Sequence, residues 1–84
     1  MKILKSCLSD NNYFCIQFNG TVFQDYELAK ILGIDYDTFI EIIVKYGAHK
    51  IRRVEYWFYT KEEVEAAILE LEPYYILTKL TTGN

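Results

Sequence analysis

The positive charges of this chain gather in one segment, whose composition suits contact with phosphate groups. Between Lys45 and Lys61 only one acidic residue, Glu55, interrupts a run of basic side chains. Those that could contact phosphate are Lys45, His49, Lys50, Arg52 and Arg53. The whole chain has a net charge of −3, so a basic edge on an acidic body would confine such contacts to that edge. A hairpin with ordinary solvated charges is the alternative interpretation.

Side chains that could carry catalysis or hold a metal are scarce. Cys7, Cys15 and His49 cannot complete a four-ligand zinc site without carboxylates, and their spacing is not that of a zinc site. The sequence contains no Gly-rich phosphate loop, no nucleophile elbow and no convincing Cys–His–Asp set. We therefore expect no enzyme, no cofactor and no metal. The two cysteines could meet across a hairpin, although two small buried hydrophobic residues are the simpler interpretation.

Length and composition predict one small globular unit. A chain of 84 residues suits a single domain over 1–80 with a frayed tail over 81–84. Aromatic residues make up 17% of the chain, so many large rings must share one core or face a partner. No stretch is apolar enough to span a bilayer, and Met1–Ser6 lacks the pattern of a signal peptide. We therefore expect a cytoplasmic protein with no membrane contact.

The amino-terminal quarter has the residues of a β-hairpin. Tyr13–Phe18 is aromatic and β-branched, and Asn19-Gly20 separates it from Thr21–Phe23. Asn-Gly favours a two-residue hairpin turn because both positions tolerate positive φ. Ile3–Leu8 predicts a further strand, joined through a turn at Ser9–Asn12.

From Asp25 onward the apolar residues follow a helical period. This period predicts a helix over Asp25–Leu32, with Asp25 as its N-cap and Gly33 as its end. A second helix is expected over Tyr36–Tyr46, with Asp35 as its cap.

The segment 25–46 has the pattern of a helix-turn-helix. Two helices that cross at a steep angle need a small residue where their backbones approach, and Ala29 provides it. The sharp turn needs a residue that accepts positive φ, and Gly33 provides that. The apolar residues expected between the helices are Leu28, Leu32, Ile34, Phe39 and Ile42. Each match alone is weak, but all of them occur together in register.

A short hairpin is expected next, as a wing over 49–59. Ile51–Tyr59 is rich in β-branched and aromatic residues, and its turn is expected near Arg53–Glu55. In a strand, Tyr56–Tyr59 would direct one pair of rings to the core and the other pair outward. We expect the tail or a second subunit to cover the outer pair. A base-stacking platform and a protein-binding patch are the alternatives.

The last predicted helix begins with a capping box. Thr60 and Glu63 can each satisfy a free backbone N–H at the start of an amphipathic helix over Lys61–Glu72, which Pro73 is expected to end. Tyr74–Leu77 is too apolar for a free tail and should pack on the domain or on a second copy. The expected architecture is a small α+β winged helix-turn-helix with an amino-terminal β-hairpin and a carboxy-terminal helix plus packed tail.

Three stretches of the sequence, Glu27–Ile34, Gly47 and Tyr56–Val64, carry a family resemblance. With them the chain resembles the excisionase-type winged helix proteins, relatives of the mercury-resistance-regulator (MerR-like) DNA-binding domains, over roughly Thr21–Leu71. The resemblance implies a cytoplasmic protein of phage or mobile-element type that binds double-stranded DNA and bends it or regulates transcription. A homodimer or cooperative copies on DNA would be expected, because a single module binds weakly.

The resemblance also implies that the exposed face of the second helix enters the major groove. The corresponding positions here are Tyr36, Asp37, Ile40, Glu41, Val44 and Lys45. Carboxylates repel phosphate, although they can accept a hydrogen bond from cytosine. We expect Tyr36, Asp37 and Glu41 to meet base edges while the basic segment holds the DNA backbone.

A protein-interaction module is the alternative function. In that case a helix-turn-helix scaffold would be reused to bind another protein, as in a phage-type factor that binds a host protein. The contact surface would then consist of Ile40, Val44, Trp57 and Tyr59, because exposed apolar side chains suit a protein partner better than a DNA groove.

Overall fold

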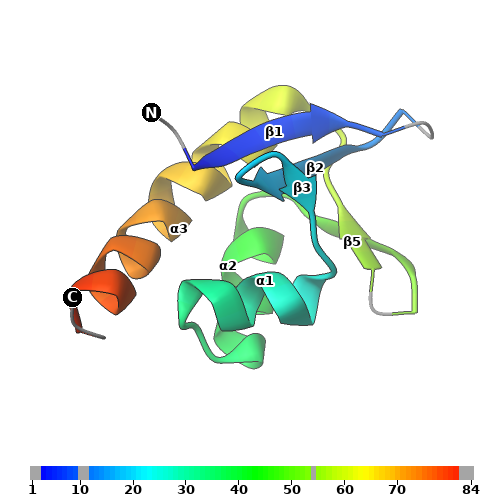
Figure 1. Cartoon of the computed structure of the whole chain (residues 1–84). Helices are drawn as coiled ribbons and strands as arrows, with labels where there is room; N and C mark the ends of the chain where they lie inside the picture. The colour runs from blue at the N-terminus through cyan, green and yellow to red at the C-terminus, as the bar shows by residue number, and fades with distance from the viewer. Residues whose placement is uncertain (1–2, 10–11, 54, 82–84) are drawn as a thin grey trace.

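Three helices and two antiparallel sheets make up the described part of the chain, which is residues 3–9, 12–53 and 55–81 of the computed structural model (Figure 1). In chain order the elements are β1 Leu4–Leu8, β2 Phe14–Phe18, β3 Thr21–Val22, α1 Asp25–Leu32, α2 Tyr36–Lys45, β4 His49–Arg52, β5 Glu55–Trp57 and α3 Lys61–Thr81. Side chains are described as far as residue 77. This is the small α+β structure that the sequence predicts.

The amino-terminal sheet has the strand order β1-β2-β3, and both pairings are antiparallel. Asn19 and Gly20 join β2 to β3 with φ of 52° and 86°, as an Asn-Gly hairpin turn requires. The predicted hairpin and the strand before it are therefore confirmed. Positions 10 and 11 of the predicted Ser9–Asn12 turn lie outside the described residues, while the Asn12 N–H donates to the Ser9 carbonyl at 3.1 Å.

The second sheet is joined to the first at its end. β4 and β5 pair antiparallel, and Phe58, directly after β5, forms a bridge with Phe14 of β2. These two residues exchange backbone hydrogen bonds of 2.8 and 2.9 Å. Because Phe58 is also buried in the core, this joint anchors the β4–β5 hairpin to the body of the molecule.

Helix α1 buries a small residue in the common core, and its end has the turn that the sequence predicts. Ala29 is only 1% exposed and lies in the common core. Gly33 ends α1 with φ of 74°; its N–H donates to the Lys30 carbonyl, and the Ile34 N–H donates to the Ala29 carbonyl. This pair of bonds is a Schellman motif, which needs a residue that adopts the left-handed conformation at little cost.

The caps of α1 and α2 differ from the prediction. Gln24, not Asp25, is the N-cap of α1, and no side chain caps this end. Asp25 is the first helical residue, and its carboxylate accepts a hydrogen bond from the Tyr56 N–H instead. This contact spans 31 positions of the chain, so the local sequence pattern could not indicate it. Asp35 does occupy the N-cap position of α2, also without a side-chain bond.

The end of α2 and the start of α3 meet at a glycine. α2 ends at Lys45, one residue earlier than predicted, and Gly47 follows with φ of 112°. A Cβ atom added to Gly47 would lie 2.5 Å from a carboxylate oxygen of Glu63. That carboxylate accepts hydrogen bonds from the Tyr59 and Thr60 N–H groups, and the Thr60 hydroxyl accepts one from the Glu63 N–H at 3.1 Å. The predicted capping box is therefore confirmed.

Helix α3 is longer than predicted. It continues through Pro73 to Thr81 instead of ending before the proline. A proline in a helix interior costs roughly 3 kcal/mol, so other contacts must outweigh that cost. Tyr74 and Tyr75 pack against the core, and the Tyr75 ring lies 5.3 Å from the Phe18 ring in an edge-to-face arrangement. Burial of these two rings explains why the helix continues.

Of the segment Tyr74–Leu77, which was expected to pack on the domain or on a second copy, only the first two residues contact the core. Tyr74 and Tyr75 contact the core, whereas Ile76 and Leu77 are exposed. In Figure 1 the carboxy-terminal half of α3 extends away from the sheets. Of the predicted frayed tail, Thr81 is the last helical residue, and 82–84 lie outside the described residues.

Candidate nucleic-acid interface

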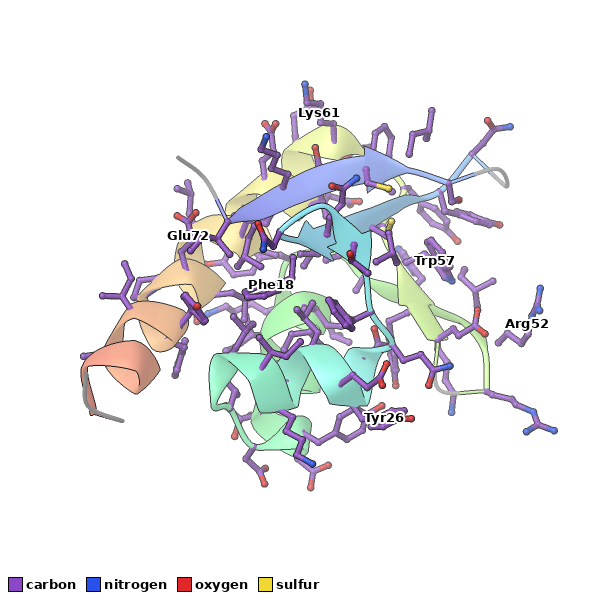
Figure 2. All side chains as sticks on the ribbon, in the orientation of Figure 1. Phe18, Tyr26, Arg52, Trp57, Lys61 and Glu72 are labelled. Carbon is purple, nitrogen blue, oxygen red and sulfur yellow. The ribbon has the colours of Figure 1, made fainter. Side chains whose placement is uncertain are left out.

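The basic hairpin, defined here as residues 49–57, carries cations at exposed positions. Lys50, Arg52 and Arg53 are all exposed, and Figure 2 shows Arg52 directed away from the body of the molecule. Arg53 follows β4 with φ of 47°, a left-handed turn position that usually takes Gly or Asn. The predicted turn at 53–55 includes Val54, which lies outside the described residues.

Lys45, which the sequence groups with the hairpin cations, is held by α3. Its Nζ lies 2.9 Å from a carboxylate oxygen of Glu70, and the Tyr46 hydroxyl donates to the same carboxylate at 2.5 Å. The bonds from Tyr46 and Lys45 lower the pKa of Glu70, and the bond to Glu70 raises the pKa of Lys45. Within the described residues the other ion pair joins Lys61 to Glu65 at 3.8 Å. The hairpin cations enter neither pair, whereas the charge of Lys45 is compensated.

The outer face of α2 is acidic and partly apolar. Asp37, Glu41 and Val44 are exposed. Tyr36 and Ile40, predicted at exposed positions, are instead half-buried and pack against the core. The solvent side of α2 therefore offers two carboxylates, a valine and the ion-paired Lys45, rather than the amide and guanidinium groups that most often contact base edges.

Four rings of the basic hairpin and its neighbours pack together. The His49 ring stacks on Tyr59 with a centroid distance of 4.1 Å, and Tyr13 lies 5.8 Å from Tyr59 and 6.5 Å from Trp57. We call Tyr13, His49, Trp57 and Tyr59 the aromatic cluster. Trp57 is half-buried in it, while Tyr59 remains 52% exposed. Tyr13 packs on the Trp57 and Tyr59 rings, where the tail or a second subunit was expected.

Asp25 is a candidate functional residue that the sequence identified only as a cap. Its carboxylate accepts the Tyr56 N–H at 3.1 Å and so links α1 to β5. Burial raises the pKa of Asp25 from 3.8 to about 6; the bond from Tyr56 opposes this rise, and the charge of Glu55 adds to it. Within the described residues Asp25 enters no ion pair. Asp25 is half-buried, and carboxylates that lose water without gaining a counter-ion are uncommon, so this joint is a candidate binding site.

The two cysteines meet across β1 and β2. Their Sγ atoms lie 3.3 Å apart, and both thiols are free. Cys15 is buried as expected, whereas Cys7 is half-buried. Burial and then the bond to Cys7 raise the pKa of Cys15 to about 12, so this thiol is a poor nucleophile. In the part of the chain that the structure describes, no group of His, Cys, Asp and Glu residues could hold a metal ion.

Comparisons with known proteins identify no relative of this chain. No protein-family model, no curated protein and no solved structure matches it. None of the described helices combines the length and the apolar composition needed to cross a membrane. What the chain does must therefore be inferred from its own geometry and charge.

Proposed function

We propose that this chain is a winged helix-turn-helix DNA-binding protein, not an enzyme, in which the basic hairpin is the wing. The observation that carries the proposal is that Lys50, Arg52 and Arg53 are exposed and enter no ion pair within the described residues. Such cations gain free energy from phosphate contacts because condensed counterions are released from the DNA. The buried Ala29 of α1 and the tight turn at Gly33 between α1 and α2 support the same proposal.

The second helix of the motif, α2, would lie beside the duplex with Tyr36, Asp37 and Glu41 nearest the bases. Its two carboxylates would repel phosphate and could accept hydrogen bonds only from groups such as the cytosine amine. Lys45 would add little, because Glu70 compensates its charge. Backbone contacts would then dominate binding, with weak sequence preference. A small transcriptional regulator or an excisionase-like architectural factor of phage or mobile-element type would bind in this way.

More than one copy would act together on DNA. A single module of this size buries little surface on a duplex and binds weakly, so a homodimer or adjacent copies would be needed for a stable complex. The exposed Ile76 and Leu77 of α3 offer apolar surface for a contact between copies.

A protein-interaction module is the second candidate function. It is favoured by the apolar groups at the surface, with Val44 47% and Tyr59 52% exposed beside the less exposed Ile40 and Trp57. A host protein would cover these side chains. Val44→Glu would then abolish the complex, because burying an unpaired charge at an apolar contact is costly.

Fluorescence anisotropy with a labelled duplex of mixed sequence, at two salt concentrations, tests the first function. The double variant Arg52→Gln/Arg53→Gln should bind every sequence more weakly, and its salt slope should fall by about 0.9 for each lost phosphate contact. Lys5→Gln/Lys61→Gln is the matched control, because it removes the same charge from exposed positions of β1 and α3. Figure 2 shows Lys61 well apart from Arg52. No duplex binding at low ionic strength, or equal losses in both double variants, would contradict the proposal.

A further inference from the structure

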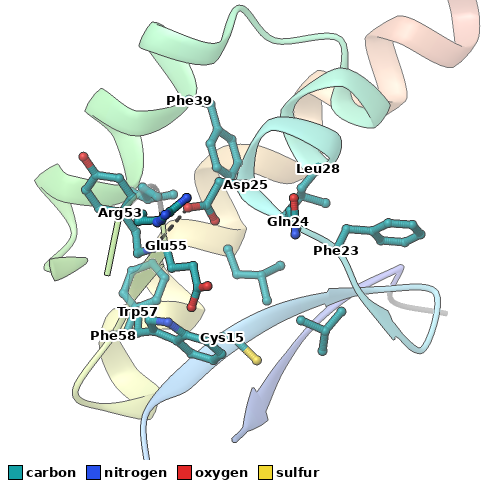
Figure 3. Close-up of a pocket in the computed structure, with 14 residues that line it drawn as sticks. Cys15, Phe23, Gln24, Asp25, Leu28, Phe39, Arg53, Glu55, Trp57 and Phe58 are labelled. Atoms are coloured by element: carbon teal, nitrogen blue, oxygen red, sulfur yellow. Dashed lines mark hydrogen bonds between the residues drawn. The ribbon is translucent and has the colours of Figure 1, made fainter. Parts of the chain in front are cut away.

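A cavity of about 490 Å³ opens where the basic hairpin meets the body of the molecule (Figure 3). It lies between the β2–β3 hairpin, the amino terminus of α1 and β5. Its aromatic lining residues are Phe23, Phe39, Tyr56, Trp57 and Phe58. Cavities of this size with mainly apolar and aromatic walls are typical of sites for small molecules.

The charged lining of the cavity is mostly acidic. Asp25 and Glu55 contribute carboxylates, and Arg53 is the one cation among the lining residues. In Figure 3 the dashed line from Asp25 marks its hydrogen bond to the Tyr56 N–H, which leaves its other oxygen outside that bond. Although Arg53 also lines the cavity, Asp25 enters no ion pair within the described residues. Among the residues that the structure describes, none therefore forms an ion pair with this carboxylate.

We propose that this cavity binds a small organic ammonium ion, carried on a flat apolar body, with Asp25 as its counter-ion. Aromatic faces attract cations through the ring quadrupole, and a flat apolar body can be buried against them. The ammonium group would supply the positive counter-charge for the Asp25 carboxylate. An anionic ligand would meet two carboxylates, which disfavours it.

Such a ligand would contact both sides of the joint. Tyr56 and Arg53 belong to the basic hairpin, whereas Phe23 and Asp25 belong to the body. A ligand in the cavity would therefore hold the hairpin in a fixed position against α1. Any effect of this on DNA rests on the proposed function, but binding of the ligand does not.

Affinity for the ligand should depend on pH through Asp25. The groups that act on this carboxylate are Glu55 and Tyr56 of β5 and Tyr36 of α2, while Arg53, after β4, lines the same cavity. Because burial raises the pKa of Asp25 to about 6, the carboxyl group becomes neutral below that pH and loses its attraction for a cation. An alkyl ammonium group stays charged throughout this range. Affinity should therefore fall as the pH drops through about 6.

Phenethylamine is a direct probe of this site, and 2-phenylethanol is the matched neutral control with the same ring and chain length. Trp57 is the only tryptophan of the chain and lines the cavity, so its fluorescence reports binding there. Near neutral pH, phenethylamine should change this fluorescence saturably, with an affinity at least about tenfold above that of the alcohol. At about pH 5 the preference should be largely lost, because Asp25 is then mostly protonated.

Two variants make the test specific. Asp25→Asn keeps an acceptor for the Tyr56 N–H but removes the charge, so it should abolish the preference for the amine. Asp37→Asn, at an exposed position of α2, should retain the preference. If Asp25→Asn fails to fold, the pH dependence of the unmodified chain still decides the question.

Three results would overturn the proposal: no saturable binding of phenethylamine, equal affinity for amine and alcohol, or a preference unaffected by pH. Duplex binding measured in parallel separates this site from the proposed function. Saturable, pH-dependent amine binding without duplex binding would support the cavity and overturn the DNA-binding function alone. Duplex binding without amine binding would overturn the cavity proposal alone.

Discussion

Two carboxylates, Asp25 and Glu70, connect the α1–α2 helix pair to the rest of the molecule, and their pKa values are shifted in opposite directions. Asp25 links α1 to the basic hairpin through one backbone N–H, and burial raises its pKa to about 6. Glu70 links α3 to the end of α2, and the hydrogen bonds from Tyr46 and Lys45 lower its pKa. Among the described residues the first joint pairs with none of the hairpin cations, whereas the second pairs Glu70 with Lys45. A basic residue in the sequence thus adds to a positive surface only where no carboxylate takes up its charge.

The largest effect on stability is expected from a substitution within the α1–α2 helix pair. Ala29 is 1% exposed, so Ala29→Leu should overpack the core and destabilise the molecule by roughly 1–3 kcal/mol. Lys30→Leu adds an apolar group at the next, exposed position and should have a smaller effect. Thermal unfolding of both variants measures the difference. An unchanged melting temperature for Ala29→Leu would show that the helices do not approach each other at this residue.

A smaller effect is expected at the hairpin joint, and it depends on pH. Since the pKa of Asp25 in the folded state, about 6, lies above its ordinary value of 3.8, the folded state binds this proton more tightly and loses stability as the pH rises between those values. Asp25→Asn removes the charge, so the variant should be more stable than the unmodified chain above pH 6. For a half-buried group we expect a gain of about 1–2 kcal/mol at neutral pH, which disappears toward pH 4.

Denaturant unfolding at several pH values measures this difference. Asp37→Asn, which removes an exposed carboxylate from the first turn of α2, is the matched control and should follow the unmodified chain. Parallel stability curves for Asp25→Asn and the unmodified chain would show that burial does not perturb Asp25.

The smallest effect is expected at the α2–α3 joint. The Tyr46 hydroxyl is the main cause of the low pKa of Glu70, so Tyr46→Phe should raise that pKa toward its ordinary value. The stability that Glu70 contributes is present at neutral pH and is lost as the pH falls, which is the opposite of the response at Asp25. An NMR titration of the Glu70 carboxyl group measures the shift, with Tyr26→Phe at an exposed position of α1 as the control. An unchanged Glu70 pKa would show that the hydroxyl does not donate to it in solution.

Elements set by neighbouring residues could be predicted from the sequence. The turn at Asn19-Gly20, the end of α1 at Gly33 and the capping box of Thr60 and Glu63 each depend on a few consecutive positions. The backbone conformation or hydrogen bond that each of them needs is available to only a few residue types, so the pattern is specific. The helix pair followed from the same local signals together with the small residue Ala29.

Features that depend on distant residues could not be predicted. Asp25 is a residue type that often caps a helix, but its carboxylate accepts a hydrogen bond from Tyr56, which lies 31 positions away. Lys45 belongs to a basic stretch of the sequence, but its ammonium group forms a hydrogen bond with Glu70, which lies 25 positions away. Pro73 is a residue type that usually ends a helix, but the two rings that follow it are half-buried against the core, and the Tyr75 ring contacts Phe18 of β2. In each case a tertiary contact outweighed the local preference.

The central claim is that the basic hairpin carries available positive charge while Lys45 does not. The salt dependence of duplex binding, compared between the single-charge variants Arg52→Gln and Lys45→Gln, tests it most directly. Because both variants remove one positive charge, any difference reports where the phosphate contact is made. Arg52→Gln should lower the salt slope by about 0.9, and Lys45→Gln should leave it unchanged. An equal fall in both slopes, or a fall only for Lys45→Gln, would contradict the claim.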